Sequence, residues 1–278
     1  MELRDRVIVV TGGGSGIGEG FCRRAVDEGV KHIIVADLNG PDAARVAADL
    51  GSAVATAATV DVADEAAIRA LVDATQRDHG PIDLFFSNAG YGKRGGLELD
   101  NSAFQRMWEV HVMAHVYAAR AVLPTMIERG EGYLLSTASA AGLLTQMDSV
   151  VYAVTKHAAV ALAEWIAINH HHQGIRASVL CPQAVATNIF KSVADDGRTN
   201  DSRPGGQAGG DGVLKPADVA EALVTAIREE KFWVLSHPEV ATYAKRKADD
   251  VDRWLSGMRR YGERLWAGTG MPGDWIVE

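Results

Sequence analysis

Short apolar runs alternate along the chain with longer stretches in which apolar residues recur every three to four positions. The short runs predict buried strands, and the longer stretches predict amphipathic helices. The runs lie at 7–10, 33–36, 54–60, 84–86, 133–136, 176–180 and 232–235. Because short connections join strand to helix throughout, we predict an α/β fold with a doubly wound parallel sheet of about seven strands and helices on both faces.

Glycine and proline residues mark the ends of the predicted helices. Pro41 suits a first helical turn, whereas Gly29 and Gly51 suit the position just after a last turn. The helices are predicted at about 17–28, 41–51, 64–80, 102–128, 150–172 and after Pro216. The helices at 102–128 and 150–172 are therefore expected to be long, and the first contains Pro124 near its end.

The chain has 278 residues, which is enough for one large α/β domain, and we assign residues 1–238 to it. Residues 239–278 are predicted to form a C-terminal extension. Its tryptophans, Trp254, Trp266 and Trp275, need an apolar surface on the same subunit or on a neighbour. The segment Ala194–Gly212 is rich in glycine and small polar residues, so we predict a mobile loop over the functional site.

Composition and charge narrow the range of partners. The net charge of −8 opposes binding to nucleic acid, and we expect none. Cys22 and Cys181 lie far apart in apolar segments, which favours a reducing compartment without disulfides. The start of the chain lacks the features of a signal peptide, and no apolar run is long enough for a membrane span. We therefore expect a soluble, cytoplasmic protein that is not associated with a membrane.

A glycine-rich segment, Thr11–Gly18, joins the first strand to the first helix. Backbone N–H groups and the helix dipole at such a junction can bind a pyrophosphate, and Gly12, Gly16 and Gly18 would allow it to approach closely. The spacing differs from the common G-x-G-x-x-G motif, so a merely flexible turn is the alternative.

Asp37 follows the second strand, nineteen residues after Gly18. A carboxylate in this place can accept hydrogen bonds from both hydroxyls of an adenosine ribose, although a simple turn residue remains the alternative. The same carboxylate would repel a 2′-phosphate, and Leu38 and Ser15 provide no cation to offset that repulsion. The sequence therefore favours NAD over NADP.

From residue 5 to residue 238, the chain resembles the short-chain dehydrogenase/reductase family. The motifs that carry the resemblance are, in order, the glycine pattern Thr11–Gly18, Asp61-Val62, Asn88-Ala89-Gly90, Ser139, and Tyr152-Ala-Val-Thr-Lys156. The resemblance implies a Rossmann fold, so that residues 1–238 would be the NAD-binding catalytic domain. It also implies a homotetramer in which the two long helices pack between subunits.

The resemblance also assigns residues to roles. Ser139, Tyr152 and Lys156 are expected to be catalytic, with Tyr152 transferring the proton, and His111 is expected to take part in the proton relay. The cofactor is expected to contact Gly12, Ser15, Gly16, Ile17, Gly18, Asp37, Leu38, Asp61, Val62, Asn88, Ala89, Gly90, Tyr152, Lys156, Pro182, Val185 and Thr187.

Two positions depart from the family pattern. His111 stands where relatives have an asparagine that helps to hold a relay water, and Gln183 stands where they have a glycine after Pro182. An imidazole has one donor and one acceptor, so neutral His111 can preserve a water chain, whereas its cation would repel Lys156. We therefore expect activity to fall on the acid side as His111 gains a proton.

The chemistry of the tyrosine can be argued from spacing. Tyr152 and Lys156 are four residues apart on a predicted helix, so both side chains project from one face. Lowering the pKa of a tyrosine by about three units requires roughly 4 kcal/mol. An ammonium group at about 4 Å can supply that much. We therefore expect Lys156 to lower the pKa of Tyr152, while Ser139 stabilises charge on the substrate oxygen.

One pair of histidines has a spacing that is found among metal ligands. His111 and His115 have the i, i+4 spacing of zinc ligands, but no adjacent glutamate or third ligand accompanies them. We expect no metal. His170, His171 and His172 lie at the predicted end of a helix, where positive charge complements the dipole.

These observations predict an NAD-dependent oxidoreductase that interconverts a small-molecule secondary alcohol and a ketone. Leu143, Met147 and Phe190 flank the expected substrate position, which suggests an apolar or ring-shaped substrate. One alternative is a catalytically weakened NAD-binding regulatory or scaffolding protein on the same fold. Another is a lyase or epimerase that keeps NAD bound.

Overall fold

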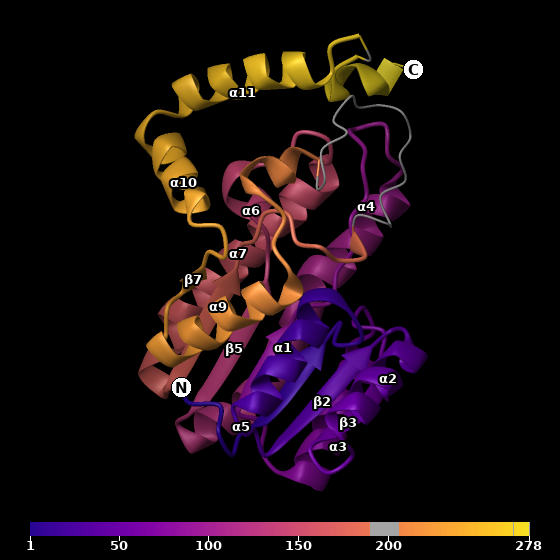
Figure 1. Ribbon diagram of the computed structural model, residues 1–278, viewed down its shortest axis with the longest axis vertical. Coiled ribbons are helices and arrows are strands. Elements are labelled where there is room, and N and C mark those ends of the chain that lie inside the picture. The colour runs from indigo at the N-terminus through magenta and orange to yellow at the C-terminus, as the bar shows by residue number, and fades with distance from the viewer. Residues whose placement is uncertain (190–205, 269, 278) are drawn as a thin grey trace.

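A computed structural model describes residues 1–189, 206–268 and 270–277 of the chain. Its centre is a parallel sheet of seven strands in the order β3-β2-β1-β4-β5-β6-β7 (Figure 1). The strands are β1 (Val7–Thr11), β2 (His32–Asp37), β3 (Ala55–Thr59), β4 (Leu84–Ser87), β5 (Gly132–Thr137), β6 (Ile175–Leu180) and β7 (Trp233–Val234). The predicted doubly wound α/β fold is confirmed.

The order of the strands reverses next to β1. The chain runs outward from β1 through β2 to β3, then returns to add β4 on the other side of β1. In such sheets a ligand binds at the carboxyl ends of the strands, at the point of reversal. The glycine-rich loop follows β1, and Asn88 follows β4, so both lie at this point.

The helices cover both faces of the sheet (Figure 1). They are α1 (Gly16–Asp27), α2 (Gly40–Leu50), α3 (Glu65–His79), α4 (Asn101–Trp108), α5 (Ala114–Arg129), α6 (Ala141–Leu144), α7 (Val150–His170), α9 (Pro216–Glu229), α10 (Glu239–Asp249) and α11 (Val251–Leu265). Shorter 3₁₀ segments are η2 (His171–Gln173), η3 (Gly206–Asp211) and η4 (Pro272–Val277).

The long helix expected at 102–128 is interrupted. A π-helical turn, η1 (Glu109–Met113), separates α4 from α5. In a π turn the backbone bonds span one residue more than in an α-helix, which changes the direction of the side chains that follow. The sequence predicted a long helix here but not its π turn, because the apolar pattern on either side does not reveal the extra residue.

Two apolar cores lie on opposite faces of the sheet. Phe85 and Phe86 are consecutive residues of β4, so their side chains point to opposite faces. Phe86 packs with residues of α1, α2 and α9, whereas Phe85 packs with residues of α3, α5 and α7. The two thiols are fully buried, Cys22 within α1 and Cys181 just after β6.

The C-terminal residues form two helices, α10 and α11, and α11 runs across one end of the molecule (Figure 1). Lys247 Nζ of α10 donates to the carbonyl oxygen of Leu143 in α6 at 2.7 Å. A Cβ added to Gly262 of α11 would lie 3.6 Å from Met147 Sδ, and Trp266 is only 3% exposed. The extension therefore packs on its own subunit, while the side chain of Trp275 lies outside the described part.

Two described helical stretches, Asn101–Arg129 and Val150–Gln173, are long and apolar enough to cross a membrane by length and composition alone. Within the most apolar window of each, 50% and 44% of the residues are buried inside the protein. Both stretches pack against the sheet, as the core helices of a soluble α/β protein do.

The segment Ala194–Gly212, expected to be a mobile loop, is only partly described, and residues 194–205 lie outside the described part. Its end forms η3, where Ala184 N–H donates to the carbonyl oxygen of Ala208 at 3.2 Å. Leu214 N–H donates to the carbonyl oxygen of Ala184 at 3.1 Å. The end of this segment is thus attached to the chain that follows β6.

Candidate active site

The glycine-rich loop closes around its own backbone. A Cβ on Gly18 would lie 2.1 Å from the carbonyl oxygen of Gly12, and one on Gly12 would lie 2.9 Å from the Cα of Ala89. Gly12 and Gly16 have φ of +64° and +55°, which L side chains rarely adopt. Only glycine fits these positions, so the loop is a fixed, close-packed turn and the flexible-turn alternative does not describe it.

The loop extends between two predicted cofactor residues. At one end Gly14 N–H donates to Asp37 Oδ2 at 2.9 Å. At the other end, a Cβ on Gly16 would lie 3.0 Å from the methyl group of Thr187. Asp37 also accepts the N–H of Asn39 at 2.9 Å, and the side chain of Leu38 is exposed. We call the loop between Asp37 and Thr187, the residues predicted to bind the adenosine ribose and the carboxamide, the cradle.

Asn88 joins three strands at the base of this cradle. Its Nδ2 donates to the carbonyl oxygens of Thr11 and Gly12 at 3.1 and 3.3 Å. Its Oδ1 accepts from Thr137 Oγ1 at 2.9 Å, and Thr11 Oγ1 accepts the N–H groups of Asn88 and Ala89. The motif Asn88-Ala89-Gly90 therefore ties the ends of β1, β4 and β5 together.

Asp61 and Val62 lie at the other side of the cradle, after β3. Val62 is buried, and Asp61 Oδ1 accepts the N–H of Ala63 at 3.0 Å. Arg106 of α4 forms an ion pair with Asp61 at 2.9 Å. The sequence did not indicate Arg106, because nothing in the local pattern shows which residue crosses from α4 to β3.

The predicted catalytic residues come together at the carboxyl end of β5. Lys156 Nζ lies 5.5 Å from the centroid of the Tyr152 ring and donates to the carbonyl oxygen of Thr137 at 3.0 Å. Ser139 Oγ accepts the N–H of Ala141 at 3.1 Å, and its hydroxyl hydrogen bond with Tyr152 lowers the pKa of the phenol. Ser139, Tyr152 and Lys156 thus form one cluster, with Cys181 close by.

Burial has opposite consequences for the two ionisable members of this cluster. Burial raises the pKa of Tyr152, and the hydrogen bond from Ser139 offsets this only in part. Burial lowers the pKa of Lys156 to about 8. The direction for Tyr152 is opposite to the expected lowering by Lys156, because burial removes the hydration that a phenolate needs.

His111 occupies the π turn and bridges two further elements. Its Nε2 accepts the N–H of Tyr91 at 3.2 Å, and Nδ1 lies 3.1 Å from Thr155 Oγ1. The Thr155 hydroxyl donates to the carbonyl oxygen of Val151, so its oxygen is free to accept from Nδ1–H. Burial holds the pKa of His111 well below its usual value, and the charges of Lys156 and His115 lower this pKa further. Neutral His111 therefore uses both nitrogens within the protein.

His115 is a second buried imidazole beside Lys156. Its Nδ1 is buried without a hydrogen-bond partner, and burial together with Lys156 lowers the pKa of His115 to about 3. Sequence reasoning considered His115 only as a metal ligand. Among the described residues, no three His, Cys, Asp or Glu side chains gather in a metal-binding cluster.

Gln183 joins the chain after β6 to the C-terminal extension. Its Nε2 donates to Asp211 Oδ2 at 2.7 Å, and its N–H donates to His237 Nδ1 at 3.2 Å. Tyr243 OH of α10 donates to Asp211 Oδ1 at 3.0 Å. We call Gln183, Asp211, His237 and Tyr243 the polar clasp. Next to it, Pro182 and Val185 are buried.

Of the residues expected to flank the substrate, Leu143 is partly buried in α6. Its side chain packs against the apolar cluster that contains Ala159, Val160 and Cys181, because α6 lies directly on α7. Met147 lies beside Gly262 of α11, at the edge of the site, and Phe190 is outside the described residues.

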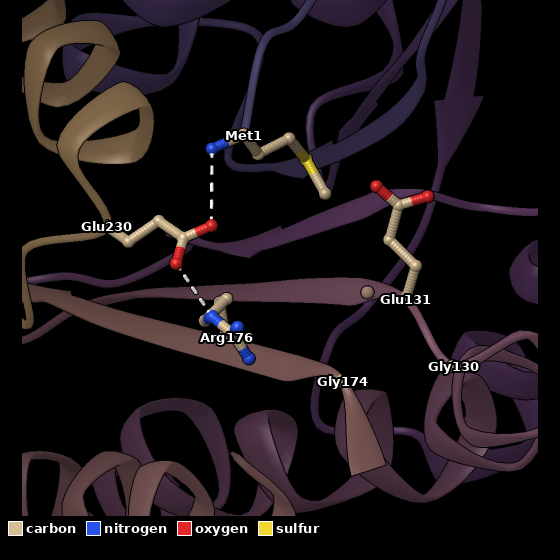
Figure 2. A pocket seen from close by; sticks show the side chains of 7 residues that line it. Met1, Gly130, Glu131, Gly174, Arg176 and Glu230 are labelled. Carbon is tan, nitrogen blue, oxygen red and sulfur yellow. Dashed lines mark hydrogen bonds and ion pairs between the residues drawn. The ribbon is translucent and has the colours of Figure 1, made fainter. Parts of the chain in front are cut away.

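A cavity of about 290 Å³ lies away from these residues, at the amino ends of β5 and β6 (Figure 2). It is lined by Met1, Gly130, Glu131, Gly132, Gly174, Arg176 and Glu230. Arg176 forms an ion pair with Glu230 at 2.7 Å within it. None of the predicted site residues lines this cavity.

Known proteins similar to this chain are short-chain dehydrogenases. Residues 6–198 match the family model for short chain dehydrogenases. The chain is 34% identical over 262 residues to a 1-deoxy-11-beta-hydroxypentalenate dehydrogenase of Streptomyces exfoliatus, covering 92% of each chain. A 2-keto-3-deoxy-L-fuconate dehydrogenase of Xanthomonas campestris is 35% identical over 188 residues, which is 67% of this chain and 60% of that protein.

Solved structures are similar over nearly the whole chain. A short-chain dehydrogenase/reductase of Burkholderia phymatum in complex with NAD has 30% identity and a TM-score of 0.81, covering 91% of this chain and 96% of that one. A 3-ketoacyl-(acyl-carrier-protein) reductase of Brucella melitensis complexed with NADH has 30% identity and a TM-score of 0.73, covering 84% and 96%.

This chain belongs to the short-chain dehydrogenase/reductase family. It is an oxidoreductase that acts on CH–OH groups, as the named relatives are dehydrogenases of that kind. Nothing in these comparisons supports the alternative of a regulatory or scaffolding protein.

Proposed function

We propose that the protein is an NAD(H)-dependent dehydrogenase that interconverts a secondary alcohol and a ketone, with Tyr152 as general acid and base. The observation that carries the proposal is the cluster of Ser139, Tyr152 and Lys156 at the end of the cradle that begins at Asp37. Bound NAD would supply the hydride acceptor for alcohol oxidation and the hydride donor for the reverse reaction.

The cradle fits a dinucleotide. Asp37 has lone pairs left after accepting Gly14 and Asn39, so it can accept from the ribose hydroxyls. The N–H groups at the start of α1 can bind a pyrophosphate, and Thr187 stands beside Gly16 for a carboxamide. Two related structures carry NAD or NADH, which agrees with this assignment. We propose NAD rather than NADP because Asp37 opposes a 2′-phosphate.

In the proposed oxidation, Tyr152 accepts the hydroxyl proton of the substrate and Ser139 donates a hydrogen bond to the same oxygen. Burial raises the pKa of Tyr152, so the phenolate needs more positive charge than Lys156 alone provides. An oxidised nicotinamide is cationic and would add that charge. Lys156, held by the carbonyl oxygen of Thr137, also points its ammonium group toward the nicotinamide ribose in this assignment.

We further propose an alicyclic, largely apolar substrate. One relative that matches 92% of the chain is named as a dehydrogenase of 1-deoxy-11-beta-hydroxypentalenate. Met147, Gly262 and Met271 lie together where α11 approaches the site, and they offer apolar surface to such a ring. We propose that the enzyme is a cytoplasmic homotetramer with no metal, and that residues 239–278 are an extension of its single domain.

The proposal is tested by following NADH absorbance at 340 nm with NAD⁺ and a panel of cyclic secondary alcohols. Tyr152→Phe keeps the ring but removes the transferable proton, so turnover is expected to fall more than about a hundredfold. Its affinity for NAD⁺, measured by calorimetry, is expected to stay within about threefold of the wild type. Full turnover by Tyr152→Phe on a substrate that the wild type oxidises would refute the assigned mechanism.

A further inference from the structure

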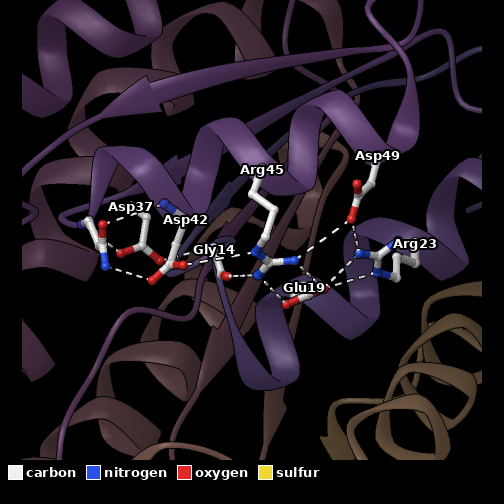
Figure 3. A network of polar contacts seen from close by, with 8 residues as sticks. Gly14, Glu19, Arg23, Asp37, Asp42, Arg45 and Asp49 are labelled. Atoms are coloured by element: carbon white, nitrogen blue, oxygen red, sulfur yellow. Dashed lines mark hydrogen bonds and ion pairs between the residues drawn. The ribbon is translucent and has the colours of Figure 1, made fainter.

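Arg45 of α2 reaches the glycine-rich loop at Gly14, which lies between Arg45 and Asp37 (Figure 3). Its Nη2 donates to the carbonyl oxygen of Gly14 at 2.9 Å. The N–H of the same glycine donates to Asp37 Oδ2. Gly14 therefore contacts both the guanidinium group of Arg45 and the carboxylate of Asp37, which is assigned to the ribose. The sequence did not indicate this cation, because the immediate neighbours of the motif residues, Leu38 and Ser15, carry no charge.

The positive charge of Arg45 is already balanced. Its Nη1 and Nη2 donate to the two oxygens of Glu19 at 3.1 and 2.9 Å. Asp42 and Asp49 lie 3.9 and 3.8 Å away. The hydrogen bond from Arg45 is the main reason that the pKa of Glu19 is lowered. Glu19 therefore stays ionised at neutral pH and occupies the two-pronged face of the guanidinium.

The whole network carries an excess of negative charge (Figure 3). Arg23 shares Glu19 and Asp49 with Arg45, at 2.8 Å from each. With Asp37 and Asp42 included, the network holds four carboxylates and these two guanidinium groups. A dianionic phosphate entering here would meet both the charge of Asp37 and a guanidinium that is unavailable to it.

We infer that Arg45 is a second specificity-determining residue for the cofactor, a potential 2′-phosphate ligand that Glu19 keeps occupied. This inference rests on the proposed preference for NAD. Asp37 repels the phosphate, and Glu19 withholds a nearby cation that could bind it. Guanidinium groups bind phosphate through paired N–H donors, and the pair that faces Glu19 would serve that purpose once it is released.

Binding of a 2′-phosphate is expected to require the loss of two carboxylates, Asp37 and Glu19. Neutralising Asp37 alone removes repulsion but leaves Arg45 bound to Glu19. Neutralising both carboxylates makes Arg45 available without adding any positive residue. The gain in 2′-phosphate binding is therefore expected only in the double variant, and only while Arg45 is present.

The test uses calorimetry with two probes, adenosine 2′,5′-bisphosphate and adenosine 5′-monophosphate, so that binding is read without turnover. Asp37→Asn is expected to bind the bisphosphate less than threefold better than the wild type does. Asp37→Asn/Glu19→Gln is expected to bind it at least tenfold more tightly than Asp37→Asn. Adding Arg45→Gln is expected to abolish that gain. Binding of the monophosphate should stay within about threefold throughout, because that probe lacks the 2′-phosphate.

A matched control changes net charge by the same amount away from the loop. Asp37→Asn/Asp78→Asn neutralises an exposed carboxylate of α3 and is expected to behave as Asp37→Asn alone. A second pair, Asp37→Ser/Glu19→Ala, is measured in parallel in case the first double variant folds poorly. The inference is overturned if neither double variant gains affinity for the bisphosphate, or if the gain survives removal of Arg45.

The underlying cofactor preference is measured separately on the wild type. NAD⁺ is expected to bind at least tenfold more tightly than NADP⁺. Equal affinities in the wild type would remove the proposed preference for NAD. A preserved preference with no effect of Glu19 and Arg45 would instead remove only their part in it.

Discussion

His111 and His115 place two buried imidazoles close to Lys156. His111 joins the π turn to Tyr91 on one side and to Thr155 of α7 on the other. A Cβ on Gly90 would lie 3.2 Å from His111 Nε2, so the imidazole also needs the glycine of the Asn88-Ala89-Gly90 motif. Neutral His111 thus contacts both elements with its two nitrogens, and its part in the proton relay stays a prediction.

The lowered pKa values of these imidazoles make the free energy of unfolding depend on pH. A folded-state pKa below the unfolded value of about 6.5 means that the unfolded chain binds more protons as pH falls. Burial lowers the pKa of His115 to about 3, so stability is lost below pH 6.5, and down to about pH 3. Between pH 7.5 and pH 5 this one group is expected to cost about 2 kcal/mol of unfolding free energy.

His115→Leu removes the titrating group and its unpartnered nitrogen. In urea denaturation at fixed protein concentration, the variant is expected to lose about 2 kcal/mol less than the wild type between pH 7.5 and pH 5. If the variant and the wild type lose the same amount, His115 is not a source of the acid sensitivity.

At the residue scale, the sequence predicted which side chains meet but not how burial changes them. Tyr152 and Lys156 meet because a separation of four residues on a helix is enough to bring them together. The raised pKa of Tyr152 depends on what covers the ring, which comes from distant segments. Arg45 and Arg106 were missed for the same reason, since their partners lie on other elements.

Among the elements, the chain after β6 differs most from expectation. Gln183, which replaces the family glycine, donates hydrogen bonds from both its backbone and its side chain within the polar clasp. Asp211 accepts hydrogen bonds from Gln183 and Tyr243, so η3 is attached both to the chain after β6 and to α10. Strands and amphipathic helices could be predicted from periodicity. The clasp and the π turn could not, because they depend on long-range contacts and on one extra residue.

Removing the centre of the clasp is expected to loosen the segment that leads into α9. Asp211→Ala leaves two donors without their shared acceptor, so amides of residues 206–214 are expected to exchange at least tenfold faster. KM for the alcohol is expected to rise several-fold with kcat less affected, because the segment borders the site and not the reacting atoms.

Tyr243→Phe is the milder control for this substitution, since it removes one donor and keeps the ring. It is expected to give an intermediate change in exchange. Unchanged exchange in both variants would show that the clasp does not hold η3.

At the scale of the whole molecule, the described surface has apolar side chains on its two long helices. Val154, Trp165 and Ile168 of α7 and Trp108 of α4 are between 38% and 76% exposed. The two helices are neighbours, and exposed apolar side chains that gather into a patch mark contact surfaces. They agree with the proposed homotetramer, in which these helices pack between subunits.

Ile168→Asp introduces a charge where such an interface would exclude water. The wild type is expected to sediment as a tetramer, and Ile168→Asp as a smaller species with the same far-UV circular dichroism. Ala70→Asp, on the exposed face of α3, is the matched control and is expected to leave the tetramer intact. A monomeric wild type, or a variant of unchanged size, would contradict this assembly.

The two buried thiols give the protein an internal reporter of its own opening. Burial raises the pKa of Cys22, and raises that of Cys181 to about 12, so neither forms the reactive thiolate while its surroundings stay closed. Cys22 lies between α1 and the sheet, whereas Cys181 adjoins Ser139 and Lys156. Alkylation of each cysteine, followed by mass spectrometry, therefore times two separate openings. Saturating NAD⁺ is expected to slow alkylation of Cys181 more than that of Cys22, and equal slowing would mean that the molecule opens only as a whole.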